Sequence, residues 1–361
     1  MKQAKISRLA TGLFASVLLV AACAGGGAQP TTAPASDAPA SGASTVPTGV
    51  APQPDQTSLK VGLSVAETSQ YAAQLAKQLD IYKKYGFTDV EVQVFEGDGK
   101  TMQALQAGQL DVGFVGVSAA ITSQTTDAPV DIVSVNARIL SDLLTSVADV
   151  KTADDLRGKC VAVSTYGGTS HGAVILALQA LGLTPEDVTI TEIGGQAARI
   201  AALQGGSCAA APVDAARQEE MAGLGFNFLV DLKKEQTPWG RSGAAFRQDW
   251  LEANRNTVLA FEAAILEAQN TMWTDVDAAA PAYAEFAQID EAQARQLIED
   301  FQEIGNRTMM WDEETFENPK KVLATVNPDV ATVNVQDAYD KTVLEELQSL
   351  GVYETLGVPL E

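Results

Sequence analysis

The residues with the clearest chemical potential are Gly168 to Gly172, which match the G-x-S-x-G pattern around the nucleophilic serine of many hydrolases. In such hydrolases, a histidine and an acid from later in the chain activate the serine. This chain holds a single histidine, His171, which directly follows Ser170. Neighbouring side chains of a helix point in different directions, so His171 is poorly placed as a base for Ser170. The pattern therefore predicts no enzyme, although a serine hydrolase stays open as an alternative.

A second motif, Gly97 to Thr101, follows a predicted strand and resembles the end of a phosphate-binding loop. The full pattern requires a glycine five places before Gly99, where this chain has Val94. An ordinary turn before a helix explains the motif better. Metal ligands are also scarce, because the chain has one histidine and three cysteines and its acidic residues are scattered. We therefore expect neither a cofactor nor a metal ion.

The elements that position Ser170 point to binding. Residues 160–164 have the pattern of a strand, residues 165–171 form a glycine-rich bend, and the residues up to 181 have the pattern of a helix. Glycines let the backbone approach a ligand, and the first amides of a helix point outward toward an acceptor group. Residues 60–65 begin a similar strand, loop and helix about a hundred residues earlier. This repetition predicts two lobes of one design, with their strand ends facing each other.

From residue 59 onward the pattern alternates strands with helices, which predicts an α/β fold with parallel-rich sheets and right-handed crossovers. We predict strands at 59–64, 90–95, 111–115, 131–135, 160–164, 188–193, 208–213 and 227–230. After Phe246 two apolar stripes predict helices that pack on the lobes. They comprise Val258, Phe261, Ile265, Ala268 and Met272, and Val335, Ala338, Tyr339, Val343 and Leu347.

The N-terminal region predicts export and a lipid anchor. Three basic residues within 1–8 precede an apolar run, Leu9 to Val20, that is too short to span a membrane. The run ends in Val20-Ala-Ala-Cys23, which resembles a bacterial lipobox, so we predict a signal peptide at 1–22 and lipidation of Cys23. Residues 23–58 are rich in Ala, Gly, Pro, Ser and Thr and predict a tether. We expect the protein on the extracytoplasmic face of the cell membrane.

Length and charge limit the choice of partners. The chain of 361 residues is long enough for two lobes with their own cores, and its formal net charge is -22. Phosphate contacts require clustered Lys and Arg, so this acidity argues against nucleic acid or an anionic membrane surface as a direct partner. We expect a monomer that reaches the membrane only through its lipid anchor.

Several segments carry a family resemblance. Gln103 to Phe114, Ala153 to Lys159 and the repeated Leu-x-x-Gly (105–108 and 203–206) resemble solute-binding proteins of ABC importers. The branch in question binds nitrate, sulfonates, taurine, thiamine pyrimidines and riboflavin. The resemblance implies a two-lobed periplasmic-binding-protein fold of the type II kind. It also implies a first lobe at 59–143, a second lobe at 144–240, a return to the first lobe at 241–361, and a permease with its ATPase as partners.

The resemblance further implies which residues line the pocket. The first lobe would contribute side chains and glycines from the loops after its first and third strands, and the second lobe would contribute its glycine-rich bend, one acid and one tryptophan. These residues are Ser64, Thr68, Gln70, Tyr71, Gly116, Ser118, Tyr166, Gly168, Thr169, Ser170, His171, Asp214 and Trp239. For Tyr71, Trp239 and Asp214 a structural role stays open: core of a helix, cover of the hinge, and helix cap.

The residue types at these positions predict the ligand class. The loops contain no Lys or Arg, Asp214 requires a hydrogen-bond donor, and Tyr71, Tyr166 and Trp239 offer flat faces. This set favours a heteroaromatic vitamin or precursor, such as riboflavin or a thiamine pyrimidine, and makes nitrate or a simple sulfonate less attractive. Taurine, a sulfonate or nitrate remains the alternative ligand. A sensor domain and a structural surface lipoprotein are further alternatives.

Two cysteines, Cys160 and Cys208, begin strands that a 2-1-3 strand order would make neighbours in the second lobe. In an oxidising compartment they can form a disulfide. Two buried free thiols are the alternative.

Overall fold

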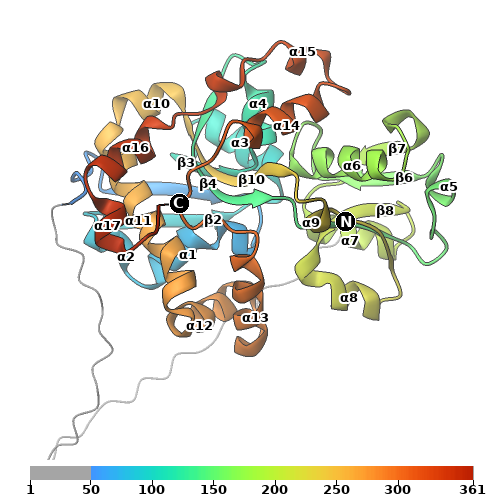
Figure 1. Cartoon of the computed structure of the whole chain (residues 1–361), viewed down its shortest axis with the longest axis horizontal. Coiled ribbons are helices and arrows are strands. Elements are labelled where there is room, and N and C mark those ends of the chain that lie inside the picture. The colour runs from blue at the N-terminus through green and yellow to red at the C-terminus, as the bar shows by residue number, and fades with distance from the viewer. Residues whose placement is uncertain (1–49, 361) are drawn as a thin grey trace, which may run out of the picture. The chain divides into compact units, whose positions relative to one another are not determined.

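The computed structural model describes residues 50–360, which contain two five-stranded sheets with helices packed on them (Figure 1). The predicted signal peptide, Cys23 and the first part of the predicted tether lie outside the described residues. Residues 50–57, which composition assigned to the tether, contact the folded part: the amides of Asp55 and Gln56 donate to Thr257 Oγ1, at 3.1 Å each. The tether therefore ends earlier than predicted.

The first sheet has the strand order β2-β1-β3-β10-β4. Strand β1 runs parallel to β2 and β3, whereas β10 runs antiparallel to β3 and β4. The strands are β1 (Ser58–Leu63), β2 (Asp89–Val94), β3 (Val112–Val115), β4 (Val130–Ile139) and β10 (Pro238–Arg247). We call this sheet and its helices the first lobe.

The second sheet repeats this arrangement, with the order β7-β6-β8-β5-β9. Strand β6 is parallel to β7 and β8, and β5 is antiparallel to β8 and β9. The strands are β5 (Asp142–Ser146), β6 (Cys160–Val163), β7 (Thr189–Glu192), β8 (Ala210–Asp214) and β9 (Asn227–Asp231). We call this sheet and its helices the second lobe. The α/β, two-lobed prediction is confirmed.

Two strands were not predicted. The eight predicted strands are present, but β5 and β10, through which the chain passes from one sheet to the other, were missed. Both run antiparallel to their neighbours, so the expectation of parallel pairing fails for them. Their residues are small or buried on both faces, which leaves no period-two alternation to detect. The predicted lobe boundaries near 143 and 240 fall within these two strands.

The helices of the first lobe precede β5 or follow β10. They are α1 (Tyr71–Gln78), α2 (Ile81–Lys84), α3 (Asp98–Gln106), α4 (Val117–Ser123), α10 (Gln248–Ala253), α11 (Arg255–Thr274), α12 (Val276–Ala287), α13 (Glu291–Gln302), α14 (Glu314–Leu323), α15 (Pro328–Ala331), α16 (Thr342–Ser349) and α17 (Val352–Leu356). Short 3-10 helices are η1 (Thr68–Gln70) and η4 (Val335–Ala338). The largest apolar core of the described residues lies between these helices and the first sheet.

The second lobe holds α5 (Ala153–Leu156), α6 (Thr169–Ala180), α7 (Gln196–Gln204), α8 (Gln218–Gly223) and α9 (Leu232–Glu235), with 3-10 helices η2 (Pro185–Asp187) and η3 (Ala215–Arg217). Helix α6 buries both faces in the core of this lobe. Among residues 50–360, no helix is both long and apolar enough to cross a membrane.

The first predicted apolar stripe is buried along α11, as its helical period requires. The second does not form one helix, because the chain is extended at Tyr339 between η4 and α16. Asp340 then accepts a hydrogen bond at 2.8 Å from the amide of Thr342, the first residue of α16. Most residues of the second stripe are buried, as predicted, but the prediction that they form a single helix was wrong.

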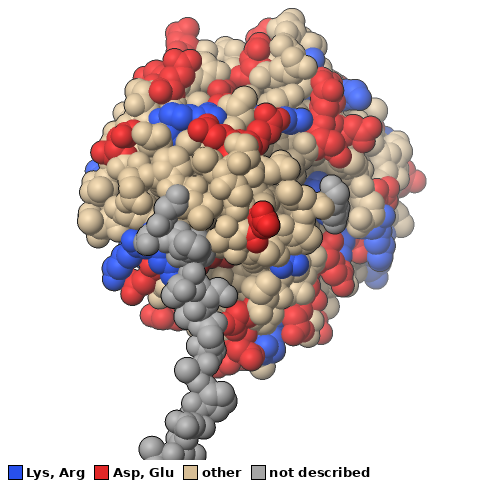
Figure 2. All heavy atoms as spheres, turned by 60° about the vertical axis from the view of Figure 1, so that its left-hand side comes forward, with Lys and Arg blue, Asp and Glu red and all other residues tan. Residues whose placement is uncertain are grey.

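On the face shown in Figure 2, acidic and basic side chains are interspersed. A continuous basic surface of the kind that binds nucleic acid is not formed there. This agrees with the net charge of -22.

Strands β6 and β8 are neighbours in the order β7-β6-β8, which brings Cys160 and Cys208 together. Their sulfur atoms are bonded in the structure, and their Cα atoms lie 4.6 Å apart. We propose that this bridge forms after export, because extracytoplasmic compartments are oxidising.

The bridge can be tested by counting thiols. In a Cys23→Ser variant of the purified protein, denatured without reductant, we expect no free thiol, and two after reduction. Two free thiols before reduction would show that the cysteines are unpaired.

A buried acid in the first lobe predicts a pH effect on stability. Glu262 on α11 is fully buried, and neither carboxylate oxygen makes a hydrogen bond of normal geometry. Burial raises the pKa of Glu262 to about 8, and the nearby Ser134 hydroxyl offsets only part of this shift. Between about pH 4.5 and 8 the unfolded chain ionises this group while the folded protein keeps it protonated. Stability therefore falls as pH rises through this window.

We expect Glu262→Gln to gain stability over the parent protein as pH rises from 5 to 8, by about 2 to 4 kcal/mol, because glutamine cannot ionise. Urea unfolding at both pH values measures this difference. Glu299→Gln on α13, an exposed position, is the matched control and should give no such trend. Equal pH profiles for the parent protein and Glu262→Gln would contradict the raised pKa.

Candidate functional site

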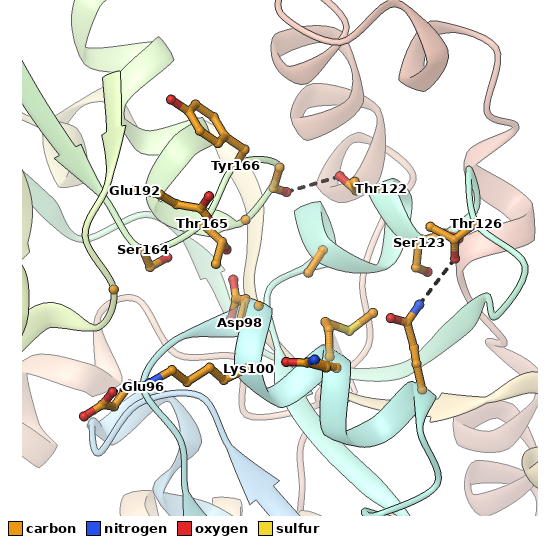
Figure 3. A pocket seen from close by; sticks show the side chains of 18 of the residues that line it. Glu96, Asp98, Lys100, Thr122, Ser123, Thr126, Ser164, Thr165, Tyr166 and Glu192 are labelled. Atoms are coloured by element: carbon orange, nitrogen blue, oxygen red, sulfur yellow. Dashed lines mark hydrogen bonds and ion pairs between the residues drawn. The ribbon is translucent and has the colours of Figure 1, made fainter. Parts of the chain in front are cut away.

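Two cavities lie where the strand ends of the lobes face each other. The inner cavity has a volume of about 50 Å³ and the outer cavity about 610 Å³, and Asp98 and Ser164 line both. The inner cavity is lined by Ser64, Val65, Glu67, Ser69, Gln70, Gly97, Asp98, Asp142, Ser164, Thr169, Ser170, Arg199 and Arg241. The outer cavity, shown in Figure 3, is lined by residues within 96–106, 119–126, 164–168 and 192–194.

Arg241 on β10 is the centre of a buried ion network. Its Nη1 donates to Asp142 Oδ2 at 3.1 Å, and its Nη2 donates to Glu67 Oε2 at 2.6 Å and to Asp214 Oδ2 at 2.5 Å. Burial alone would lower the pKa of the Arg241 guanidinium, but the three carboxylates raise it above its ordinary value. The network joins Glu67 of the first lobe to two acids of the second, across the inner cavity.

The acids in this network respond to burial. Burial raises the pKa of Glu67 to about 7, although Arg241 lowers it in part. Burial also raises the pKa of Asp142, again against the effect of Arg241. Arg241 itself keeps one unused donor, because its buried Nε has no hydrogen-bond partner among the described residues.

A second guanidinium, Arg199 on α7, reaches the inner cavity. It is 5% exposed and donates to the Pro212 carbonyl from Nε and Nη2, at 3.2 and 3.1 Å, and to the Gly194 carbonyl from Nη1 at 3.2 Å. No carboxylate of residues 50–360 lies within ion-pair distance of it, and burial lowers its pKa. A negatively charged ligand group in the cavity would stabilise this charge.

Hydroxyl and amide groups form the rest of the inner wall. In the first lobe, the Ser64 amide donates to Gln70 Oε1 and Gln70 Nε2 donates to Ser64 Oγ, both at 2.8 Å. In the second lobe, the Ser164 amide donates to Ser170 Oγ at 2.8 Å, and the two serine hydroxyls lie 2.6 Å apart. Each lobe therefore ties the serine at the end of its first parallel strand to the residue six places later.

The glycine-rich bend ends in helix α6, whose first amide has an acceptor. The Thr169 amide and hydroxyl donate to Asp98 Oδ2 of the first lobe, at 3.0 and 2.8 Å. Gly116 lies against the same threonine, and a Cβ atom built there would stand 1.8 Å from Thr169 Oγ1. Only glycine allows this close approach of the two lobes. Gly116, which was predicted to line the pocket, lines neither cavity.

Tyr71 was wrong as a pocket residue. It is fully buried in the apolar core of the first lobe, its ring lies 4.7 Å from that of Tyr283, and its hydroxyl donates to the Ala279 carbonyl at 3.2 Å. The apolar face of α1 turns the side chain away from the loop that precedes it.

Trp239 was also wrong as a stacking surface. Its side chain is fully buried in the core of the second lobe, and a Cβ atom built at Gly172 would stand 2.3 Å from its ring. Asp214 is not free for a ligand either. Its Oδ2 is bound by Arg241 and by Ser141 Oγ, and its Oδ1 accepts from the Ala216 amide at 2.9 Å.

The remaining predicted residues divide between the two cavities and their surroundings. Ser64, Gln70, Thr169 and Ser170 line the inner cavity, and Tyr166 and Gly168 line the outer one. Tyr166 is 55% exposed and its hydroxyl donates to the Ile190 carbonyl at 2.7 Å. Thr68, Ser118 and His171 line neither cavity.

The side chains of the serine and the histidine of the hydrolase-like motif bond to residues of the same lobe. Ser170 Oγ bonds to Ser164, and His171 Nδ1 accepts from the Gly167 amide at 3.0 Å. Burial lowers the pKa of His171. Among residues 50–360, no group of three or more His, Cys, Asp or Glu side chains is arranged to hold a metal ion.

The sequence patterns did not predict two residues of the inner cavity, Arg199 and Arg241. The two guanidiniums reach the inner cavity from a helix and from a crossing strand, and Lys100, after β2, lines the outer cavity. Arg241 stands among Gly240, Ser242 and Gly243 in a buried strand, and a charge in such a setting indicates buried partners. This pattern in the sequence therefore indicates that Arg241 has buried partners.

The chain resembles several known proteins. The model of the NMT1-like family matches residues 52–288. The taurine-binding periplasmic protein of Escherichia coli (strain K12) is 26% identical over 214 residues, which is 58% of this chain and 66% of that protein. This chain spans from about two fifths to two thirds of the curated relatives that it matches.

Solved structures share the fold. The periplasmic nitrate-binding protein NrtA from Synechocystis PCC 6803 has a TM-score of 0.66 at 18% identity, covering 85% of this chain and 91% of its own. The periplasmic aliphatic sulphonate binding protein SsuA from Escherichia coli has a TM-score of 0.60 at 20% identity, covering 79% and 92%.

Removal of Arg241 should show how much the buried network contributes. We expect Arg241→Met to destabilise the protein by about 3 to 5 kcal/mol, because three buried carboxylates lose their cation. Arg217→Met is the control, since Arg217 pairs with Glu220 at the surface, and it should cost about 1 kcal/mol or less. Urea unfolding at neutral pH measures both. Equal losses would show that the network does not stabilise the fold.

Proposed function

Because this chain belongs to the NMT1-like family, as its sequence predicts, we propose that it is the extracytoplasmic solute-binding component of an ABC importer. It would bind a small solute between its lobes and deliver it to a permease, without converting it chemically. The taurine-binding relative and the facing strand ends with buried polar groups support this role. The predicted lipid on Cys23 would hold it at the membrane as a monomer.

The charged side chains of the inner cavity indicate which class of ligand it would bind. Arg199 and Arg241 stand opposite Glu67, Asp98 and Asp142 within one small cavity. An anionic group of the ligand would accept from Arg241 Nε, and an ammonium group would meet the carboxylates. A small zwitterion such as taurine satisfies both signs of charge, so it replaces the heteroaromatic vitamin as the ligand that we favour.

The size of the inner cavity favours a small solute over a large one. Its volume of about 50 Å³ is below the roughly 150 Å³ of an apolar cavity that holds benzene, so even a solute of the size of taurine requires the lobes to move apart. A flavin would require a much larger separation. A zwitterion would exchange its own charged groups for some of the bonds that are broken within the network.

A heteroaromatic vitamin is the second candidate, because of the outer cavity. Its volume of about 610 Å³ lies in the range of sites for such ligands, and the exposed ring of Tyr166 borders it. Of the three aromatic side chains expected at the pocket, however, this is the one that a ligand can reach, since Tyr71 and Trp239 are core residues.

Thermal unfolding of the purified protein with taurine, alkanesulfonates, nitrate, riboflavin and a thiamine pyrimidine tests the two candidates. A ligand at a hundredfold excess over its Kd adds about 2.7 kcal/mol of stability and raises the midpoint. We expect the largest rise with taurine. A rise with riboflavin or the pyrimidine alone would favour the outer cavity, and no rise with any compound would contradict solute binding of this class.

A further inference from the structure

Asp98, the first residue of α3, forms part of the wall of both cavities. It is 6% exposed, and in Figure 3 its side chain points from α3 toward the loop that carries Ser164 and Thr165. Its Oδ2 accepts from the Thr169 amide and hydroxyl, at 3.0 and 2.8 Å. This residue of the first lobe therefore occupies the N-terminal end of α6 in the second.

The N-terminus of α6 would otherwise suit an anion. The helix has 12 residues, so its first amides carry the partial positive charge of the aligned peptide dipoles. The Asp98 carboxylate occupies this position. A sulfonate or carboxylate group of a ligand would meet that carboxylate at close range. Arg241 Nε is a buried donor of the inner wall without a partner among the described residues.

The wall around Asp98 is tightly closed. A Cβ atom built at Gly99 would stand 2.2 Å from Thr165 Cγ2, and one built at Gly116 would stand 1.8 Å from Thr169 Oγ1. Thr122 Oγ1 of the first lobe also donates to the Gly167 carbonyl of the second, at 3.2 Å. Asp98 and Ser164 line both cavities, so the Asp98 side chain forms part of the wall between the inner cavity and the outer one.

We propose that Asp98 is a specificity-determining residue with two effects. Its charge excludes solutes that carry an anionic group without a compensating ammonium group. Its bulk limits the ligand to the inner cavity and keeps longer solutes from extending into the outer one. The inference rests on the proposed function, since it concerns which solutes the site between the lobes accepts.

Two variants separate the effects. Asp98→Asn keeps the shape and removes the charge, whereas Asp98→Ala removes both. Calorimetric titration of the full-length protein with methanesulfonate should show at least a tenfold gain in affinity for each variant over the parent protein. With hexanesulfonate, Asp98→Ala should gain at least tenfold, and Asp98→Asn should gain clearly less because the wall remains.

Glu91→Gln is the matched control. Glu91 on β2 is exposed and lines neither cavity, and its replacement removes one negative charge, as Asp98→Asn does. Its affinities should stay within about twofold of the parent protein. Gains equal to those of Asp98→Asn would overturn the proposal, because any loss of negative charge would then suffice.

The remaining outcomes separate this inference from the proposed function. If the parent protein binds taurine but neither Asp98 variant gains a sulfonate, the inference fails and the proposed function stands. If the variants gain sulfonates while the parent binds no taurine, the inference stands and the ligand assignment fails. If Asp98→Ala does not fold, the methanesulfonate titration of Asp98→Asn still decides, and no gain there overturns the proposal.

Discussion

The burial of one positive charge, the Arg241 guanidinium, constrains how the two sheets meet. Asp142 and Asp214 are direct partners in the antiparallel pairing of β5 with β8, and two carboxylates opposite each other repel. Arg241 reaches them from an irregular part of β10, where the pairing with β4 shifts register between Pro238 and Ser242. Such an irregularity re-aims a side chain out of the regular ladder. The crossing strands, both sheets and the inner cavity thus depend on a single ion network.

The same network determines what the cavity can accept. Arg199 and Arg241 are outnumbered by Glu67, Asp98, Asp142 and Asp214, and burial raises the pKa of Glu67 toward neutrality. A purely anionic solute would meet arginines that already bond to carboxylates or carbonyls. A purely cationic solute would compete with Arg241 for the carboxylates. A solute with both charges can replace bonds of each kind without leaving a buried charge unpaired. Under the proposed function, the residues that join the lobes would therefore also select the ligand.

Sequence reasoning succeeded where periodicity and glycines decide the structure. The eight predicted strands and the stripe along α11 follow from patterns that neighbouring residues repeat. It failed for β5 and β10, in which apolar and polar residues do not alternate. It also failed for Tyr71 and Trp239, because a position beside a loop does not show whether the side chain points into the core or into the cavity. The ligand class was inferred from loops without basic residues. That inference lost its basis because Arg199 and Arg241 arrive from elements that are distant in sequence.

The internal repeat explains why the sequence predicts several residues of the inner cavity but not the charges that line it. Ser64 with Gln70 and Ser164 with Ser170 form corresponding pairs, and they hold each strand end in the same way in both lobes. Asp98 and Gln196 also correspond, since they begin α3 and α7, but their roles differ. Gln196 accepts from the Asp214 amide within its own lobe at 2.8 Å, whereas Asp98 crosses to Thr169 in the other. Repeated positions build the two walls, and the positions that depart from the repeat carry the charges between them. A comparison of the two halves therefore finds the cavity, while its chemistry depends on the residues that the halves do not share.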